Sequence, residues 1–423
     1  MVSSGPVPDP AAGSAADIAG AYVALCLRLR RLVPALVDAA AVDPALRRSV
    51  AAEPLPTAAG LVREAGRLAA ALPDAGWAPA RERFLAGQLA AVEWRARRLA
   101  GQPVSLRCEV RRCLDVEAVP GEPDAYRAAH RELAAVLPGS GPLGPRLAAH
   151  RRQEAVPADG LGPAVRALAG ALQGRTAARY GLPPDEAVEY RLVDDAPWRA
   201  LQAYRGAHRS TVQVNAEART TAGRLPRLVA HETYPGHHVE CLHMERAAAR
   251  GRPELTVAVL GTPQTVVSEG LAECGLDVVV GPGWGPWAAS VLATAGVRTD
   301  GALAERLDPV LAVLRRACVD AALLLHRRGR PTVDSAAAAE AHLRRWLLLE
   351  PARARRVVDA LARPLWRTQV VAAVEGAELM RERLLRTGLD PVAEHLRLLD
   401  DPDRPASLRA RTSAESTSHR DGR

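Results

Sequence analysis

Three histidines and a glutamate lie within the eight residues 231–238 (HETYPGHH). A catalytic zinc ion takes three nitrogen or oxygen ligands from the protein and keeps a fourth position open for water. Two histidines four residues apart on one helix commonly supply two of these ligands, but here Pro235 occupies the fourth position after His231. In an unbroken helix, His231 and His237 would point about 120° apart and lie about 9 Å apart along the axis.

The Pro-Gly pair after Tyr234 should break that helix, because proline lacks an N–H and clashes with the preceding turn. Pro226 suits the first turn of a helix that runs to Tyr234, and a second helix can restart near His237. A kink between them brings the second histidine back toward the first. We therefore expect His231 and His237 to bind a metal ion, with His238 as the alternative to His237.

A second segment, residues 265–280 (TVVSEGLAECGLDVVV), carries Glu269, Glu273 and Asp277 at intervals of four residues, on one stripe of a helix. Their neighbours are apolar, so this stripe is no ordinary solvated surface. Buried carboxylates need a cation or hydrogen bonds to offset their desolvation. We predict Glu269, 38 residues after His231, as the third metal ligand, and Glu273 and Asp277 as groups that orient the imidazole rings.

These roles define a catalytic site for one Zn²⁺ ion per chain. The ion would lower the pKa of a bound water, and Glu232, whose side chain diverges from that of His231 by about 100° on a helix, would take the proton. Residues 210–215 (STVQVN) alternate polar and apolar side chains like a half-buried strand. An extended substrate could pair along it, although a purely structural strand fits equally well.

The elements around this site are predicted to be mostly helices. Residues 81–101 place Leu85, Leu89, Val92, Ala96 and Leu99 on one face, and similar runs cover 17–40, 56–72, 124–137, 163–180, 302–326, 335–348 and 353–385. Only 188–193 and 210–215 read as strands. The predicted fold is mainly α, a large multi-helix body with a small β-sheet beside a zincin-type helix pair. One domain, 16–399, divides into a helical half, 16–205, and a metal-site half, 206–399. Residues 1–15 and 400–423 are predicted to be disordered tails.

Composition excludes several classes of protein. The net charge of +8 comes with no lysine, with abundant Ala, Gly and Pro and with one Phe, which indicates GC-rich codons rather than a basic surface. The arginines alternate with acids, so no nucleic-acid partner is expected. No run of 18 apolar residues predicts a membrane helix, and the first residues do not resemble a secretory signal, so a cytoplasmic location is expected. Six cysteines without a C-x-x-C pair predict free thiols.

The segment 231–238, followed by Glu269-Gly270-Leu271-Ala272, resembles the bacterial family called domain of unknown function 885, which is grouped with metallopeptidases of the glutamate-zincin type. The likeness extends from about residue 80 to 385. Supporting residues are Arg98-Leu99-Ala100-Gly101, Leu137-Pro138-Gly139, Gly181-Leu182-Pro183, Pro197-Trp198, Tyr204-Arg205-Gly206, Asn215, His326 and Glu375-Gly376. The resemblance implies a mainly helical fold with Glu269 as a ligand. Dipeptidyl peptidase III, a looser analogue, favours His237 over His238.

The chain departs from this family at two positions. Relatives carry an aromatic residue where this chain has Leu271, and a tyrosine where it has Ala373. Since a tyrosine there could stabilise an oxyanion, we consider His326, Arg367 and Tyr234 as substitutes, and predict His326 and Arg367 as catalytic residues beside Glu232.

The sequence favours a zinc-dependent hydrolase of a peptide or small amide. One alternative is a metal-dependent enzyme of another class, with iron or manganese on the same two-histidine, one-carboxylate set. The other is a non-catalytic binding protein that retains the fold, suggested by Ala373. Glu232 argues against this second alternative, because a purely structural metal site does not need a base.

Overall fold

A computed structural model of the chain describes residues 15–196, 198–364, 366–385 and 388–421. It confirms the predicted mainly α fold with a small sheet. The predicted tail 1–15 lies outside these residues, apart from Ala15, which begins the first helix. Among the described residues, no helix is both long and apolar enough to cross a membrane.

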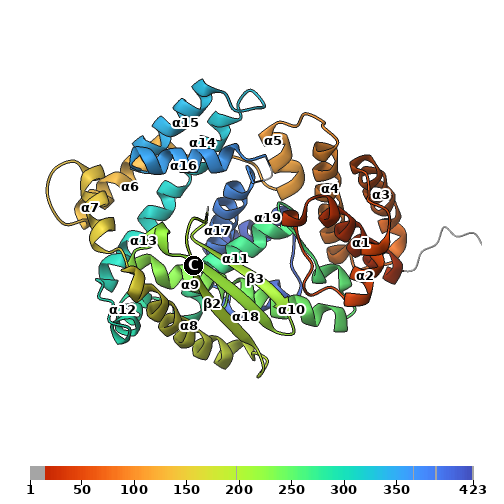
Figure 1. Cartoon of the computed structure of the whole chain (residues 1–423), viewed down its shortest axis with the longest axis horizontal. Helices are drawn as coiled ribbons and strands as arrows, with labels where there is room; N and C mark the ends of the chain where they lie inside the picture. The colour runs from red at the N-terminus through yellow and green to blue at the C-terminus, as the bar shows by residue number, and fades with distance from the viewer. Residues whose placement is uncertain (1–14, 197, 365, 386–387, 422–423) are drawn as a thin grey trace, which may run out of the picture.

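The N-terminal helices form a group of their own at the right of Figure 1. They are α1 (Ala15–Leu32), α2 (Pro44–Ala52), α3 (Ala58–Ala71) and α4 (Pro79–Leu99). Their apolar faces share one core, because leucines at helical spacing, such as Leu85 and Leu89, are fully buried there. Strand β1 (Val37–Asp38) connects this group to the rest by pairing antiparallel with β5 (Ala258–Val259).

The small sheet contains β2 (Ala187–Val193), β4 (Arg209–Asn215) and β3 (Ala200–Gly206), in that spatial order. The central strand, β4, pairs parallel with β2 and antiparallel with β3. The prediction that 210–215 forms an edge for substrate is therefore wrong, since both sides of β4 are occupied. The edge strands are β2 and β3. The sequence did not reveal β3, because ALQAYRG contains no β-branched residue.

Helices α9 (Leu225–Glu232), α10 (His237–Ala249), α11 (Pro263–Val279), α17 (Gln369–Leu385) and α18 (Pro391–Asp400) surround the predicted site. The backbones of α11 and α17 cross closely, at the glycines of the two Glu-Gly pairs. A Cβ on Gly270 would lie 2.3 Å from the carbonyl oxygen of Gly376, and a Cβ on Gly376 would lie 2.1 Å from that of Val266. Only glycine fits at this crossing, which fixes α11 against α17.

Helix α8 (Ala158–Tyr180) packs beside β2 and α9. The other helices cover the upper and left parts of Figure 1. They are α5 (Leu106–Glu109), α6 (Pro123–Val136), α7 (Leu143–Gln153), α12 (Trp284–Thr294), α13 (Gly301–Arg315), α14 (Ala317–Leu325), α15 (Val333–Trp346) and α16 (Pro351–Ala362).

The structure corrects the C-terminal boundary. Helix α19 (Pro405–Asp421) occupies most of the predicted tail 400–423, and Leu408 and Thr412 on it are buried. Its composition is polar, but these two residues lie four apart on one face, and Arg409 pairs with Glu375 of α17. The predicted halves 16–205 and 206–399 also share a sheet, because β4 pairs with two strands of the first half.

Candidate metal centre

The kink between α9 and α10 has the predicted form. Helix α9 ends at Glu232 and α10 begins at His237. The N–H of Gly236 donates to the carbonyl oxygen of Ala230 at 3.0 Å, so the chain folds back onto the end of α9. A Cβ on Gly236 would lie 1.9 Å from the carbonyl oxygen of His231. This glycine therefore permits the return that carries His237 to His231.

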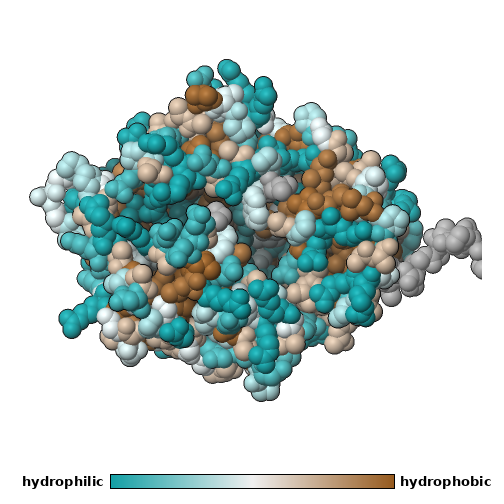
Figure 2. Space-filling view, in the orientation of Figure 1, coloured by the Kyte–Doolittle hydropathy of each residue, from teal (hydrophilic) through white to brown (hydrophobic). Residues whose placement is uncertain are grey.

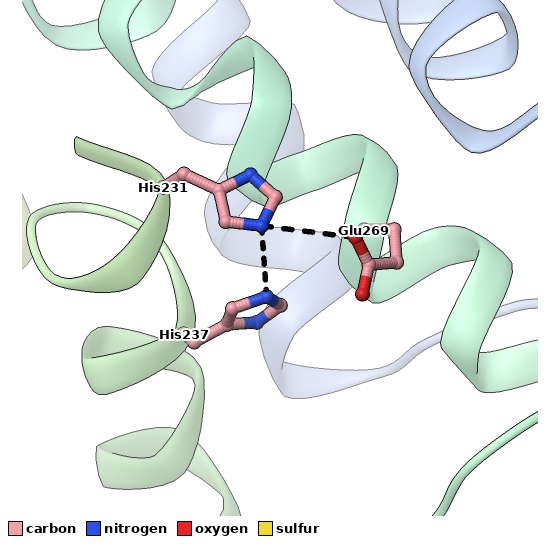
Figure 3. A group of neighbouring side chains, drawn as sticks. All are labelled: His231, His237 and Glu269. Atoms are coloured by element: carbon pink, nitrogen blue, oxygen red, sulfur yellow. Dashed lines mark hydrogen bonds and ion pairs between the residues drawn. The ribbon is translucent and has the colours of Figure 1, made fainter. Parts of the chain in front are cut away.

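The side chains of His231, His237 and Glu269 converge, as Figure 3 shows. The Nε2 atoms of the two histidines lie 3.2 Å apart, and Nε2 of His231 lies 3.7 Å from Oε2 of Glu269. One ligand atom from each residue lies within 4.8 Å of the others. Two nitrogens bound to one tetrahedral zinc ion at its usual bond length would be roughly 3.3 Å apart, so the spacing fits zinc.

Another side chain contacts His231, His237 and Glu269 in each case, on the side away from the point where the three converge. Nδ1 of His231 lies 3.7 Å from Oε2 of Glu273, and Nδ1 of His237 lies 3.2 Å from Oε2 of Glu240. A carboxylate at Nδ1 favours the tautomer whose Nε2 lone pair is free for a metal ion. The amide of Gln369 donates to Oε1 of Glu269 at 2.8 Å, which leaves Oε2 toward the histidines.

The charges around the histidines suit a cation. Burial alone would lower the pKa of His237, but its hydrogen bond to Glu240 and the charge of Glu269 outweigh burial and raise the pKa to about 9. Burial would raise the pKa of Glu273, but the charge of Arg315 and the contact with His231 hold it well below its usual value. The cluster therefore keeps Glu273 ionised and favours a proton or a metal ion at the histidines.

His238 is excluded as a ligand in this arrangement. It is fully buried, its Nδ1 lies 2.8 Å from the hydroxyl of Ser210, and its Nε2 lies 2.9 Å from Glu186. Both ring nitrogens are therefore occupied. The structure places His237, and not His238, beside His231.

Glu232 faces the same cavity as the three converging residues, a space of about 350 Å³. The molecular surface is hollowed near the middle of the face in Figure 2. Oε2 of Glu232 accepts a hydrogen bond of 2.9 Å from the backbone N–H of Gln202, on the edge strand β3. Ala200, Leu201 and Trp366 also line this cavity. The carboxylate of Glu232 is thus oriented by the backbone of β3.

The structure does not bring the other predicted catalytic residues to this cavity. His326 is buried, with its Nε2 2.9 Å from the carbonyl oxygen of Leu361, and it lines a separate cavity. The guanidinium of Arg367 donates to Glu109 at 2.7 Å. Both predictions followed from the missing tyrosine at position 373, and spacing in sequence gave no information on distance in space.

Two further predictions need correction. Tyr234 is buried, and its hydroxyl donates to Glu186 at 2.7 Å, so it cannot replace an oxyanion donor in the cavity. Asp277 was expected to orient an imidazole ring beside Glu273. Instead it accepts from the guanidinium of Arg227 at 2.9 Å.

Sequence reasoning missed several residues that hold the site. Glu240 follows His237 by three residues, a helical spacing that could have revealed it. Gln369 and Gln202 gave no signal, because each reaches the site from a distant element. Arg315 contacts Glu273 from α13, and in a chain with so many arginines it could not be distinguished.

Comparisons with known proteins bear on the fold only. No family model matches the sequence, and no curated protein matches it. The fold is similar to that of a putative lipoprotein from Colwellia psychrerythraea, at 14% identity and a TM-score of 0.50, over 87% of this chain and 71% of that one. A putative lipoprotein of unknown function from Shewanella oneidensis aligns with a TM-score of 0.47 at 15% identity, over 86% of this chain and 74% of that one.

Proposed function

We propose that the chain is a zinc-dependent hydrolase of a peptide or small amide, with His231, His237 and Glu269 as metal ligands. The observation that supports this most is the convergence of the three ligand atoms within 4.8 Å, each braced by another side chain. Braced ligands are typical of metal sites. We also propose that the chain shares this chemistry with the family that it resembles, domain of unknown function 885.

The roles of the chain's own residues follow from their positions. A zinc ion, when bound, supplies positive charge that polarises water. Glu232 would be the base that accepts a proton from such a water and passes it to the departing nitrogen. The N–H of Gln202 orients the carboxylate of Glu232 for both steps. Glu273 and Glu240 hold the two imidazole rings in place.

A peptide-like substrate fits the shape and lining of the cavity. The edge strand β3 contributes Ala200, Leu201 and Gln202 to its wall, and an edge strand offers backbone groups to an extended chain. Leu36, just before β1, and Val259, on β5, add apolar surface to the lining. We therefore propose a substrate that is extended at the scissile amide and apolar beside it.

The test combines metal analysis with catalysis. Protein purified without added metal should contain about one divalent ion per chain, and the identity of the ion separates zinc from iron or manganese. Blocked short peptides and acyl-amides are then screened with and without a chelator. Glu232→Gln should keep the ion and lower turnover by about a hundredfold or more, with little effect on substrate affinity.

Glu132→Gln, an exposed change on α6, is the matched control. Near-full activity of Glu232→Gln on a substrate that the native protein cleaves would refute the role of the base. Loss of the ion in this variant would make Glu232 a ligand. A protein that binds the ion and shows no hydrolysis in the whole screen would support the non-catalytic alternative.

We also propose that the protein acts in the cytoplasm. All six cysteines are free thiols, and disulfides are rare in reducing compartments. Cell fractionation with an antibody against the native chain tests this location.

A further inference from the structure

A second cavity, of about 300 Å³, lies apart from the metal centre and shares no lining residue with it. It is bordered by α7, α13, α16 and the segments that precede β3 and α9. Its walls contain an unusual number of arginines. They are Arg151, Arg199, Arg219, Arg224, Arg315 and Arg353.

Four of these guanidinium groups belong to partly buried arginines and form no ion pair with the described residues. Arg315 pairs with Glu273, but among the residues that the structure describes, no hydrogen bond or ion pair is formed by the side chains of Arg151, Arg199, Arg224 and Arg353. None of the four is fully exposed. Arginines are almost never fully buried without a partner, and these four lie partly buried in one shared cavity without one.

The acids of this cavity do not neutralise the arginines. Asp308 pairs with Arg227 at 2.8 Å, which lies outside the cavity. Glu154 accepts from the hydroxyl of Thr299, and Asp300 caps the start of α13. With the exposed Arg219, five of the six arginines form no ion pair with the described residues, and subtracting these last two acids leaves an excess of three positive charges around the cavity.

Burial, together with repulsion between the arginines, lowers the pKa of two of them. Burial and the charges of Arg353 and Arg224 lower the pKa of Arg199, and the same two residues lower that of Arg151 after burial. Guanidinium groups stay protonated in proteins. Repulsion between these positive charges therefore destabilises the folded protein. An anion among these groups would remove this repulsion.

The geometry points to a ligand: we propose that this cavity binds a small organic dianion, carrying carboxylate or phosphate groups. Arginine is the residue best suited to both groups, because its planar fork can donate two parallel hydrogen bonds. Leu147, Leu307 and Leu311 provide an apolar part of the wall, against which the carbon skeleton of the ligand packs. The volume fits a small molecule.

Binding of succinate and of inorganic phosphate tests the proposal, by calorimetry and thermal unfolding at constant ionic strength in chloride. The variants are Arg151→Gln and Arg353→Gln, on helices α7 and α16, far from the metal ligands in sequence. Each should bind the preferred anion about tenfold more weakly or worse, since a charged hydrogen bond is lost. Arg48→Gln, an exposed change on α2, should bind it as the native protein does.

Stability gives a second, independent readout. The anion should raise the melting temperature of the native protein. Without the anion, Arg151→Gln and Arg353→Gln should melt at the same temperature as the native protein or higher, because repulsion is relieved. If these arginines merely support the fold, both variants should melt at a lower temperature than the native protein. A lower melting temperature would overturn the proposal.

A His231→Ala variant separates this site from the metal centre. Retention of anion binding in His231→Ala supports the arginine cavity, whereas its loss there, with binding intact in the arginine variants, places the anion at the metal and refutes the proposal. A preference for succinate or for phosphate identifies the ligand as a carboxylate or a phosphate compound. Absence of binding of both anions at 10 mM, about ten times a weak 1 mM dissociation constant, also refutes it.

Discussion

The metal centre and the arginine cavity gather opposite charges. The first collects carboxylates around two histidines and is proposed to bind a cation, and the second collects guanidinium groups and is proposed to bind an anion. The ion pair of Glu273 with Arg315 joins them, because Glu273 contacts His231 and Arg315 lines the arginine cavity. Arg227 forms a second connection, because it donates to the carbonyl oxygen of Glu273 and pairs with Asp308 of the arginine cavity.

The two regions also differ in how their residues are distributed along the chain. The proposed metal ligands come from two short segments, 231–237 and the carboxylate stripe of α11, so residue types and intervals reveal them. The arginines come from five separate segments between residues 151 and 353. In a chain where every basic residue is arginine, no local pattern marks them. A cavity whose residues come from distant segments can be recognised only in the folded protein.

The largest expected effect concerns the choice between two adjacent histidines. His237→Ala should lower zinc affinity by more than about a thousandfold, because it removes one of three ligands. His238→Ala should retain the metal, since both nitrogens of His238 are bonded to Ser210 and Glu186. Zinc titration of the two variants against a fluorescent chelator measures this. An equal loss of zinc affinity in both variants would show that the kink does not direct His237 alone toward His231.

A smaller effect should follow from breaking the pair that joins the two regions. Glu273→Gln removes the charge behind His231 and should weaken zinc binding by about tenfold to a hundredfold, the usual effect of such a partner. Asp277→Asn, one turn later on α11, is the control, because Asp277 pairs with Arg227 and not with histidine. If both changes weaken zinc binding alike, the effect is a general loss of negative charge.

The smallest effect is a difference in histidine titration between the regions. In the metal-free protein, His237 should titrate near pH 9, and His150, in the arginine cavity, below its usual value, because burial lowers its pKa. The contribution of His237 to stability is complete below about pH 6.5 and is lost as the pH rises through about 9. The contribution of His150 is lost as the pH falls below about 6.5.

Ring-proton NMR of the native protein, with His237→Ala and His150→Gln for assignment, measures both values. Similar pKa values for the two rings would contradict the opposite charges of the two regions, negative around His237 and positive around His150. Zinc should suppress the titration of His237 and leave that of His150 unchanged.

The fold and the site could be predicted in part, for reasons that particular residues make clear. The kink at Tyr234 and the carboxylate stripe from Glu269 follow from local sequence, because proline, glycine and helical spacing act over a few residues. Strand β3 could not be found, since its residues become a strand only by pairing with β4. Helix α19 was missed because its polar composition concealed Leu408, which is buried by contacts with distant helices.

The crossing of Gly270 and Gly376 has a consequence for the order in which the protein is made. Helix α11 carries Glu269, but its packing partner α17 and the supporting Gln369 are about a hundred residues further along the chain. A growing chain that has released α11 from the ribosome therefore still lacks the surface that positions this carboxylate. Metal loading is therefore expected only after α17 has been synthesised, so that a chain without this helix does not carry a competent site.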